Sequence, residues 1–212
     1  MAMAELYIPD PVERANLGVF VARAVRLDSD ALVRLRAVGD RLHAWVDTPF
    51  DALVTRSVGG GLRPGDLTIK GTDMLAAMAV VGDTVVDPGK AQDARWRCAL
   101  PPERGWRAVD QVPAEVLTEL AGQGAAVART HPGSSGRPPS DLLDQKVITV
   151  SGAGLDVGVP LRCLFALSGM GFVGKPTAGQ TVRVWATDWW LRLDARYGAV
   201  LRRRRAVLPL LV

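Results

Sequence analysis

Hydrophobic and polar residues alternate along two stretches of the chain, residues 33–56 and 182–203. Alternation with a period of two, interrupted by turn residues, is typical of half-buried strands. Each stretch therefore predicts three short antiparallel strands. Apolar residues at helical spacing precede both stretches, over residues 11–27 and 160–170. Because the order of helix and strands recurs, the pattern predicts an internal duplication.

Turn and helix signals elsewhere predict the remaining elements. Asp10 and Pro11 mark the start of the first helix, with Asp10 as its cap, and Gly39-Asp40 indicates a hairpin turn. Thr72 is the expected cap of a short helix. The further elements expected are a strand at 67–69, helices at 73–81 and 113–130, and strands at 146–151 and 155–159.

These elements predict an α+β fold made of two pseudo-symmetric halves. We expect each half to contain a three-stranded antiparallel meander and extra strands, packed with one or two helices. The expected divisions are an N-terminal half at 1–82, a connecting segment at 83–140 and a C-terminal half at 141–212. The connecting segment holds the helix at 113–130 and a Pro/Gly-rich linker, and Trp96 and Trp106 are expected to pin it to the rest of the chain. Because each half is small for a core of its own, we expect one compact unit.

Three short stretches carry a resemblance to a known family. They are Leu142-Leu143-Asp144-Gln145, Val159-Pro160-Leu161-Arg162-Cys163-Leu164 and Gly169-Met170-Gly171-Phe172. Over nearly its whole length the chain resembles an uncharacterised family of roughly 200-residue actinobacterial proteins. The resemblance implies no activity and supplies no catalytic residues.

Composition and charge narrow the classes of protein. With 48% hydrophobic and 23% charged residues the chain is expected to be globular, and no apolar run approaches the ~20 residues of a membrane span. We therefore expect a cytoplasmic protein without membrane contact. Cys98 and Cys163 are far apart and indicate free thiols. The formal net charge is +4, which equals the charge of the run Arg202, Arg203, Arg204 and Arg205, so the remainder is neutral.

Three glycines, Gly152, Gly154 and Gly158, stand between an apolar strand and an apolar helix, as in dinucleotide-binding folds. Asp156 would place a negative charge inside such a phosphate cradle, and residues 155–159 alternate like a returning strand. The alternative interpretation, a glycine hairpin, is therefore favoured. We expect no cofactor.

Catalytic and metal-binding patterns are weak. The chain has two histidines, of which His43 lies within a predicted strand and His131 opens the linker. Ser168 lacks the glycine of a serine-hydrolase elbow, and scattered aspartates at strand ends are typical of solvated turns. We expect neither catalytic residues nor a metal site.

Strand parity instead indicates a candidate interaction face. Alternation places Trp and Arg side chains opposite the apolar side chains of both meanders. Such residues are enriched at binding hot spots. The candidate face consists of Trp185, Trp190, Arg192, Arg183, His43 and Trp45, with the arginine run at 202–205 as a basic tail.

Three hypotheses of function follow from this face. The leading one is a non-catalytic interaction protein that binds a protein partner or self-associates. A nucleic-acid-binding protein that uses the same face and the arginine run comes second. An unrecognised enzyme comes third. It is also left open whether helices of the other half cover the face and make its tryptophans core residues.

Overall fold

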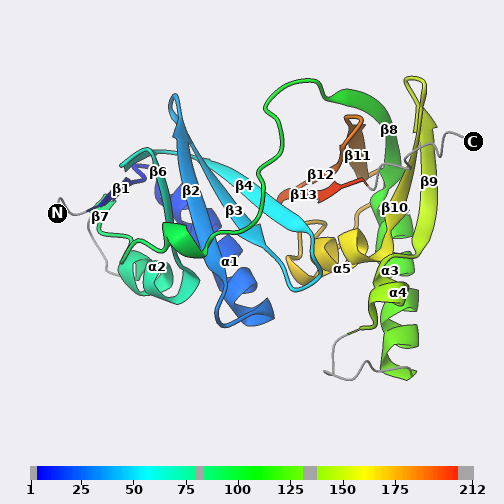
Figure 1. Ribbon diagram of the computed structural model, residues 1–212, viewed down its shortest axis with the longest axis horizontal. Helices are drawn as coiled ribbons and strands as arrows, with labels where there is room; N and C mark the ends of the chain where they lie inside the picture. Colours follow the sequence, from blue (N-terminus) through cyan, green and yellow to red (C-terminus); the bar gives the residue numbers. More distant parts are fainter. Residues whose placement is uncertain (1–3, 80–83, 131–137, 205–212) are drawn as a thin grey trace, which may run out of the picture. The chain divides into compact units, whose positions relative to one another are not determined.

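A computed structural model describes residues 4–79, 84–130 and 138–204 of the chain (Figure 1). The chain divides into two units, Met1–Ala99 and Leu100–Val212. Each is a mixed α+β unit with an antiparallel sheet, which confirms the predicted fold class. The boundary between the units falls within the predicted connecting segment at 83–140, between Ala99 and Leu100. That the chain forms one compact unit stays a prediction.

The first unit contains a four-stranded antiparallel sheet in the order β6-β2-β3-β4. Strands β2, β3 and β4 form the first predicted meander, and β6 pairs with β2. Helix α1 packs against β4 and α2, so the helices share one face of this sheet (Figure 1). The elements are α1 (Pro11–Leu27), β2 (Leu32–Val38), β3 (Arg41–Asp47), β4 (Leu53–Gly59), β6 (Asp66–Lys70) and α2 (Gly71–Met78).

The start of α1 is the predicted one, but the start of α2 is not. The Asp10 side chain accepts a hydrogen bond of 2.8 Å from the Val12 amide, and Pro11 opens the helix. Thr72, the predicted cap of the next helix, lies inside α2, which begins at Gly71 without a side-chain cap. The Gly71 amide donates to the carbonyl oxygen of Ala31 at 2.9 Å, so β6 runs into α2 without a capping turn.

Three short strands of the first unit have no counterpart in the sequence analysis. They form a separate small antiparallel sheet in the order β5-β1-β7. Strands of two or three residues are too short to show a period of two, so the alternation could not indicate them. These strands are β1 (Glu5–Tyr7), β5 (Gly61–Arg63) and β7 (Val85–Val86).

The second unit repeats this architecture with a four-stranded sheet in the order β8-β11-β12-β13. Strands β11, β12 and β13 form the second predicted meander, and α5 packs against β13 and α3. Both meanders and the helix before each are therefore confirmed. The elements are β8 (Arg107–Pro113), α3 (Ala114–Thr130), α5 (Leu161–Gly169), β11 (Thr181–Ala186), β12 (Trp190–Ala195) and β13 (Gly198–Arg203).

The two units differ in chain order at the edge of the sheet. In each, an edge strand runs directly into a helix that packs against the helix preceding the meander. This pair is β6 and α2 in the first unit, where it follows the meander, but β8 and α3 in the second, where it precedes the meander. Only the meander and the helix before it keep the same order in both units, and the predicted duplication rests on them.

The glycine motif forms a hairpin, as predicted. Strands β9 (Lys146–Gly152) and β10 (Leu155–Pro160) pair antiparallel through a two-residue loop. Ala153 and Gly154 have positive φ angles of 50° and 71°, which suit a tight hairpin turn. Because β10 separates Gly152 and Gly154 from α5, the N-terminus of α5 does not adjoin the loop as a phosphate site would require.

A buried ion pair joins α5 to the short helix α4 (Ser140–Leu143). The Nη2 and Nε atoms of Arg162 donate to Oδ1 of Asp144 at 2.7 and 3.0 Å. Only 6% of the Arg162 side chain is exposed. Without Asp144 this guanidinium would keep its charge while buried, at a large cost in free energy.

We predict that Asp144→Ala lowers the free energy of unfolding by about 3 kcal/mol in urea denaturation, because it removes the Asp144 carboxylate from a buried arginine charge. Asp188→Ala is the matched control, since it removes an ion pair with Arg107 whose aspartate is 78% exposed. In the control variant the free energy of unfolding should differ from the wild type by less than the experimental error. Equal losses in both variants would contradict the assignment.

A second prediction concerns two glycines of α3. A methyl group at Gly122 would meet no atom within 4 Å, whereas one at Gly124 would overlap the Leu161 side chain of α5. Gly122→Ala should therefore raise the free energy of unfolding by up to about 1 kcal/mol, and Gly124→Ala should lower it by about 1–3 kcal/mol. Thermal and urea unfolding measure both. A stabilising Gly124→Ala would show that α3 and α5 pack less closely.

Candidate functional site

The residues of the predicted face differ in exposure. In the second unit Arg183 is exposed, and Trp185 and Arg192 are half-buried cross-strand neighbours. Trp190 is only 6% exposed. In the first unit His43 and Trp45 are half-buried and alternate with buried neighbours along β3.

In the first unit Trp96 packs on this face. The Arg34 guanidinium lies over the Trp96 ring, 5.9 Å from its centroid, and makes two hydrogen bonds of 2.8 Å with Asp66. These hydrogen bonds hold the pKa of Arg34 above its ordinary value. The Gln92 amide donates to the Thr68 carbonyl oxygen at 2.7 Å, which fixes the same segment along β6. Trp96 therefore pins its segment to the sheet, as predicted.

Trp106 plays the same part in the second unit. The Arg192 guanidinium lies 5.9 Å from the centroid of the Trp106 ring, and its Nε donates to Asp194 at 2.6 Å. The Trp106 indole donates to the Pro102 carbonyl oxygen at 2.9 Å. Arg192 was expected to face another molecule, but these contacts within the unit already occupy it.

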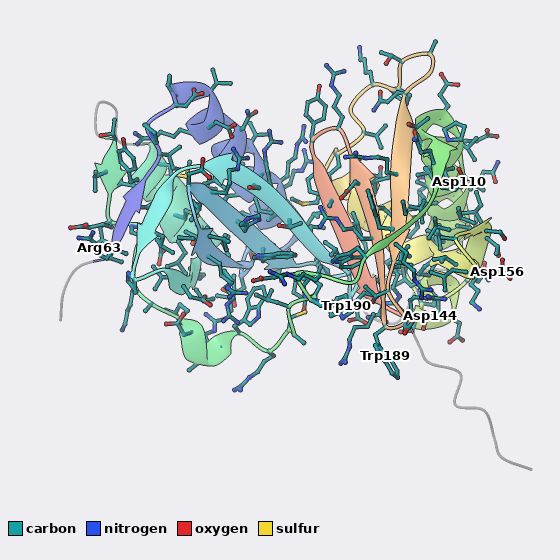
Figure 2. All side chains as sticks on the ribbon, turned by 90° about the horizontal axis from the view of Figure 1, so that it is seen from above. Arg63, Asp110, Asp144, Asp156, Trp189 and Trp190 are labelled. Carbon is teal, nitrogen blue, oxygen red and sulfur yellow. The ribbon has the colours of Figure 1, made fainter. Side chains whose placement is uncertain are left out.

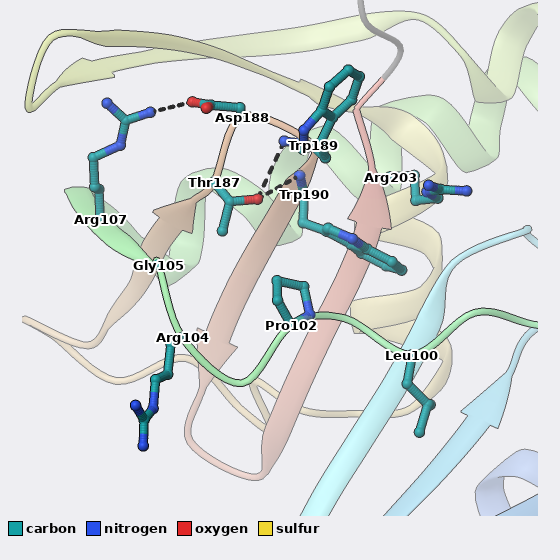
Figure 3. A pocket seen from close by; sticks show the side chains of 10 residues that line it. All are labelled: Leu100, Pro102, Arg104, Gly105, Arg107, Thr187, Asp188, Trp189, Trp190 and Arg203. Carbon is teal, nitrogen blue, oxygen red and sulfur yellow. Dashed lines mark hydrogen bonds and ion pairs between the residues drawn. The ribbon is translucent and has the colours of Figure 1, made fainter.

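The expected exposure of Trp190 is corrected by the structure. Figure 3 shows the Trp190 ring between Pro102 and Arg203, and the Arg203 guanidinium lies 5.9 Å from its centroid. Strand parity correctly placed Trp190 opposite Leu191. It could not show that the segment before β8 passes over the same side of the sheet.

The neighbouring Trp189 is the exposed aromatic residue. It is 58% exposed and lies at the periphery of the second unit (Figure 2). Its position follows from the turn between β11 and β12, where the Thr187 hydroxyl accepts hydrogen bonds from the amides of Trp189 and Trp190 at 3.2 and 3.0 Å. A threonine followed by Asp188 at a strand end is a turn signal, and it could have distinguished the two tryptophans.

Arg204 holds this turn in place. Its amide donates to the Trp189 carbonyl oxygen at 2.8 Å, and Nη1 donates to the Thr187 carbonyl oxygen at 2.9 Å. Nη2 donates to the carbonyl oxygen of Asp156 at 3.1 Å. The arginine run was expected to be a basic tail, but Arg204 is held by these hydrogen bonds within the second unit. Arg205 lies outside the described residues.

A pocket of about 650 Å³ opens beside Trp189 (Figure 3). Its wall combines apolar, aromatic and basic side chains from the segment before β8, the β11–β12 turn and the end of β13. The pocket is lined by Leu100, Pro102, Arg104, Gly105, Arg107, Thr187, Asp188, Trp189, Trp190 and Arg203. Of these lining residues, only Trp190 and Arg203 were predicted from the sequence as site residues. The others were not, because residues 100–107 meet the β11–β12 turn only in the folded chain.

The pocket has an excess of positive charge. Three arginines and one aspartate line it, and Arg107 already pairs with that aspartate, Asp188, at 2.6 Å. Neither Arg104 nor Arg203 forms an ion pair with a described residue. No histidine lines the pocket. Over residues 4–79, 84–130 and 138–204, no group of three His, Cys, Asp or Glu residues could hold a metal ion.

We predict that Trp190→Ala and Trp189→Ala have very different effects on stability. Trp190→Ala should lower the free energy of unfolding by about 3–5 kcal/mol, because it empties a buried aromatic site. Trp189→Ala should change it by less than about 0.5 kcal/mol. Urea denaturation of the two variants decides the matter, and similar losses would show that Trp189 is also part of the core.

Each half of the chain matches a sequence family. The sequence model of a domain of unknown function, DUF8185, matches residues 101–207. This chain belongs to the DUF8185 family. Residues 1–98 match a second domain of unknown function, DUF8010. A comparison with curated proteins found no match. The resemblance to an uncharacterised family is thereby confirmed.

The fold of this DUF8185 protein is similar to that of bacterial sliding clamps. The Caulobacter crescentus β sliding clamp matches with a TM-score of 0.58 and 15% identity, over 95% of this chain and 65% of the clamp. The Bacillus subtilis clamp matches with 0.58 and 13%, over 96% and 64%, and the Streptococcus pyogenes β subunit with 0.58 and 9%, over 95% and 64%. The chain thus spans less than two thirds of these clamps. At such identities the likeness shows the fold alone.

One further property concerns membranes. Within the described part of the chain, none of the helices has the length and apolar character that crossing a bilayer requires.

Proposed function

We propose that this protein is a non-catalytic interaction protein and that the pocket beside Trp189 binds a protein partner or a second copy of the chain. The observation that supports this most strongly is the 58% exposure of Trp189 at a pocket with two arginines that lack ion-pair partners among the described residues. A large exposed aromatic residue beside arginine is typical of a binding hot spot.

The chemistry of the lining supports binding rather than catalysis. The Thr187 hydroxyl is the obvious nucleophile, but it accepts hydrogen bonds from two amides, and no histidine stands among the lining residues to activate it. Asp188 is held by Arg107. A pocket of this kind orients a bound group without offering a proton-transfer pair.

The clamp-like fold is compatible with an interaction role. One C. crescentus clamp holds polyethylene glycol at a region described as β-motif tethering, and a clamp from Bartonella birtlesii is bound to griselimycin. These statements concern those proteins. For this chain they support only the proposal that the same fold can carry a binding site.

Nucleic-acid binding is the second candidate function, because an exposed tryptophan beside arginines also suits base stacking. Its predicted basis was the arginine run, yet Arg204 is engaged with three carbonyl oxygens. Apart from that run the chain is neutral. Binding through phosphates would fall steeply as salt rises, which separates this candidate from a protein partner.

We also propose a cytoplasmic location. Cys98 and Cys163 are free thiols, and Cys163 is buried. Free cysteines without disulfides are usual in reducing compartments.

The test compares Trp189→Ala with Val127→Ala, which truncates a 47% exposed apolar residue of α3. Sizing should be performed on each purified chain, and capture from cell extract with and without nuclease. We expect Trp189→Ala either to lose self-association or to capture at least tenfold less partner than the wild type. Val127→Ala should behave as the wild type. Capture that nuclease abolishes would favour nucleic acid. Unchanged assembly and capture in Trp189→Ala would contradict the proposal.

A further inference from the structure

We propose that the pocket recognises an extended acidic peptide, in which one carboxylate binds Arg203 and a neighbouring apolar side chain packs on Trp189. This inference rests on the proposed function and names the chemistry of the partner. It would apply whether the peptide belongs to another protein or to a second copy of the chain.

Arg203 is preorganised to bind an anion. Its guanidinium lies over the Trp190 ring, 5.9 Å from the centroid, and Trp190 is itself buried. A guanidinium that stacks on a ring still presents its N–H donors at its edge. Arg203 is exposed and forms no ion pair with a described carboxylate. Stacking thus reduces the entropy lost when a carboxylate binds, while the charge stays available.

Trp189 supplies the apolar part of the site. Its ring is exposed, but its backbone is fixed by the amide of Arg204 and the hydroxyl of Thr187. Leu100 and Pro102 line the same pocket. A side chain such as leucine or phenylalanine would therefore pack on a rigid aromatic surface, which is how hot spots gain affinity.

The size and charge of the pocket favour a short segment with few negative charges. Its volume of about 650 Å³ lies in the ~300–1,000 Å³ range of small-ligand sites. Arg104 provides a second positive charge without an ion pair to a described residue, but the 78% exposed Asp188 lies next to Trp189. A peptide can place its carboxylate away from Asp188. A nucleic-acid strand carries one phosphate per nucleotide and would meet that aspartate with a negative charge.

The test uses a displayed library of random nine-residue peptides selected on the full-length chain. Three variants are compared with the wild type. Arg203→Gln removes the anion contact, Trp189→Ala removes the apolar surface, and Arg129→Gln is the matched control on an exposed arginine of α3. Thermal unfolding confirms that each variant is folded. Fluorescence anisotropy then measures the affinity of selected peptides, of the same peptides with Asp or Glu changed to Asn or Gln, and of labelled oligothymidylate.

We expect selected peptides to carry Asp or Glu within two positions of a large apolar residue. Arg203→Gln should weaken their binding about tenfold, as expected for a lost charged hydrogen bond. Neutralising the acidic residue of the peptide should cost the same factor on the wild type but nothing further on Arg203→Gln, since the two changes remove one contact. Trp189→Ala should weaken binding at least tenfold, and Arg129→Gln should leave it unchanged.

Three results would overturn the inference in distinguishable ways. Selected peptides without acidic residues that still require Trp189 would contradict the acidic partner and leave the interaction function standing. Absence of selection on the wild type would contradict the acidic peptide, whereas the proposed function is contradicted only by unchanged assembly and capture in Trp189→Ala. Tighter binding of oligothymidylate than of any peptide, lost in Arg203→Gln, would assign the pocket to nucleic acid.

Discussion

The structure depends on how each four-stranded sheet covers its second face. The helices of each unit pack on one face, and the other carries polar and aromatic side chains that still need partial cover. Two tryptophans provide it, with Trp96 on Arg34 in the first unit and Trp106 on Arg192 in the second. Both contacts combine ring burial with a cation over the ring, which adds about 0.5–2 kcal/mol where the cation is partly desolvated. Part of each face is therefore covered by the chain itself.

The pocket lies where this cover ends. Trp190 lies beside Pro102, while the residue before it, Trp189, is exposed to solvent. Arg204 and Thr187 fix the turn by hydrogen bonds to its main-chain groups, so the exposure of Trp189 is a property of a rigid element. Sites on rigid elements lose less conformational entropy on binding. This arrangement supports the proposal that the second unit serves to bind another molecule.

Local patterns in the sequence predicted most of the fold. The period of two located both meanders, Asp10 and Pro11 marked the start of α1, and the Gly152 motif was correctly predicted as a hairpin. The site was predicted only in part. Parity depends on neighbours in the chain, but burial of Trp190 depends on Pro102, nearly ninety positions away. The pairing of β8 with β11 is equally remote in sequence, and no local signal encodes it.

The central claim is that Trp189, and not the sheet face as a whole, is the centre of binding. Hydroxyl-radical footprinting with mass spectrometry tests this claim directly. It follows the oxidation rates of all six tryptophans in the free chain and in its complex with a captured partner or a selected peptide. The account predicts that Trp189 reacts fastest in the free chain and becomes protected by the bound partner, while Trp45, Trp96 and Trp185 keep their rates. Protection at those three residues with an unchanged rate at Trp189 would contradict it.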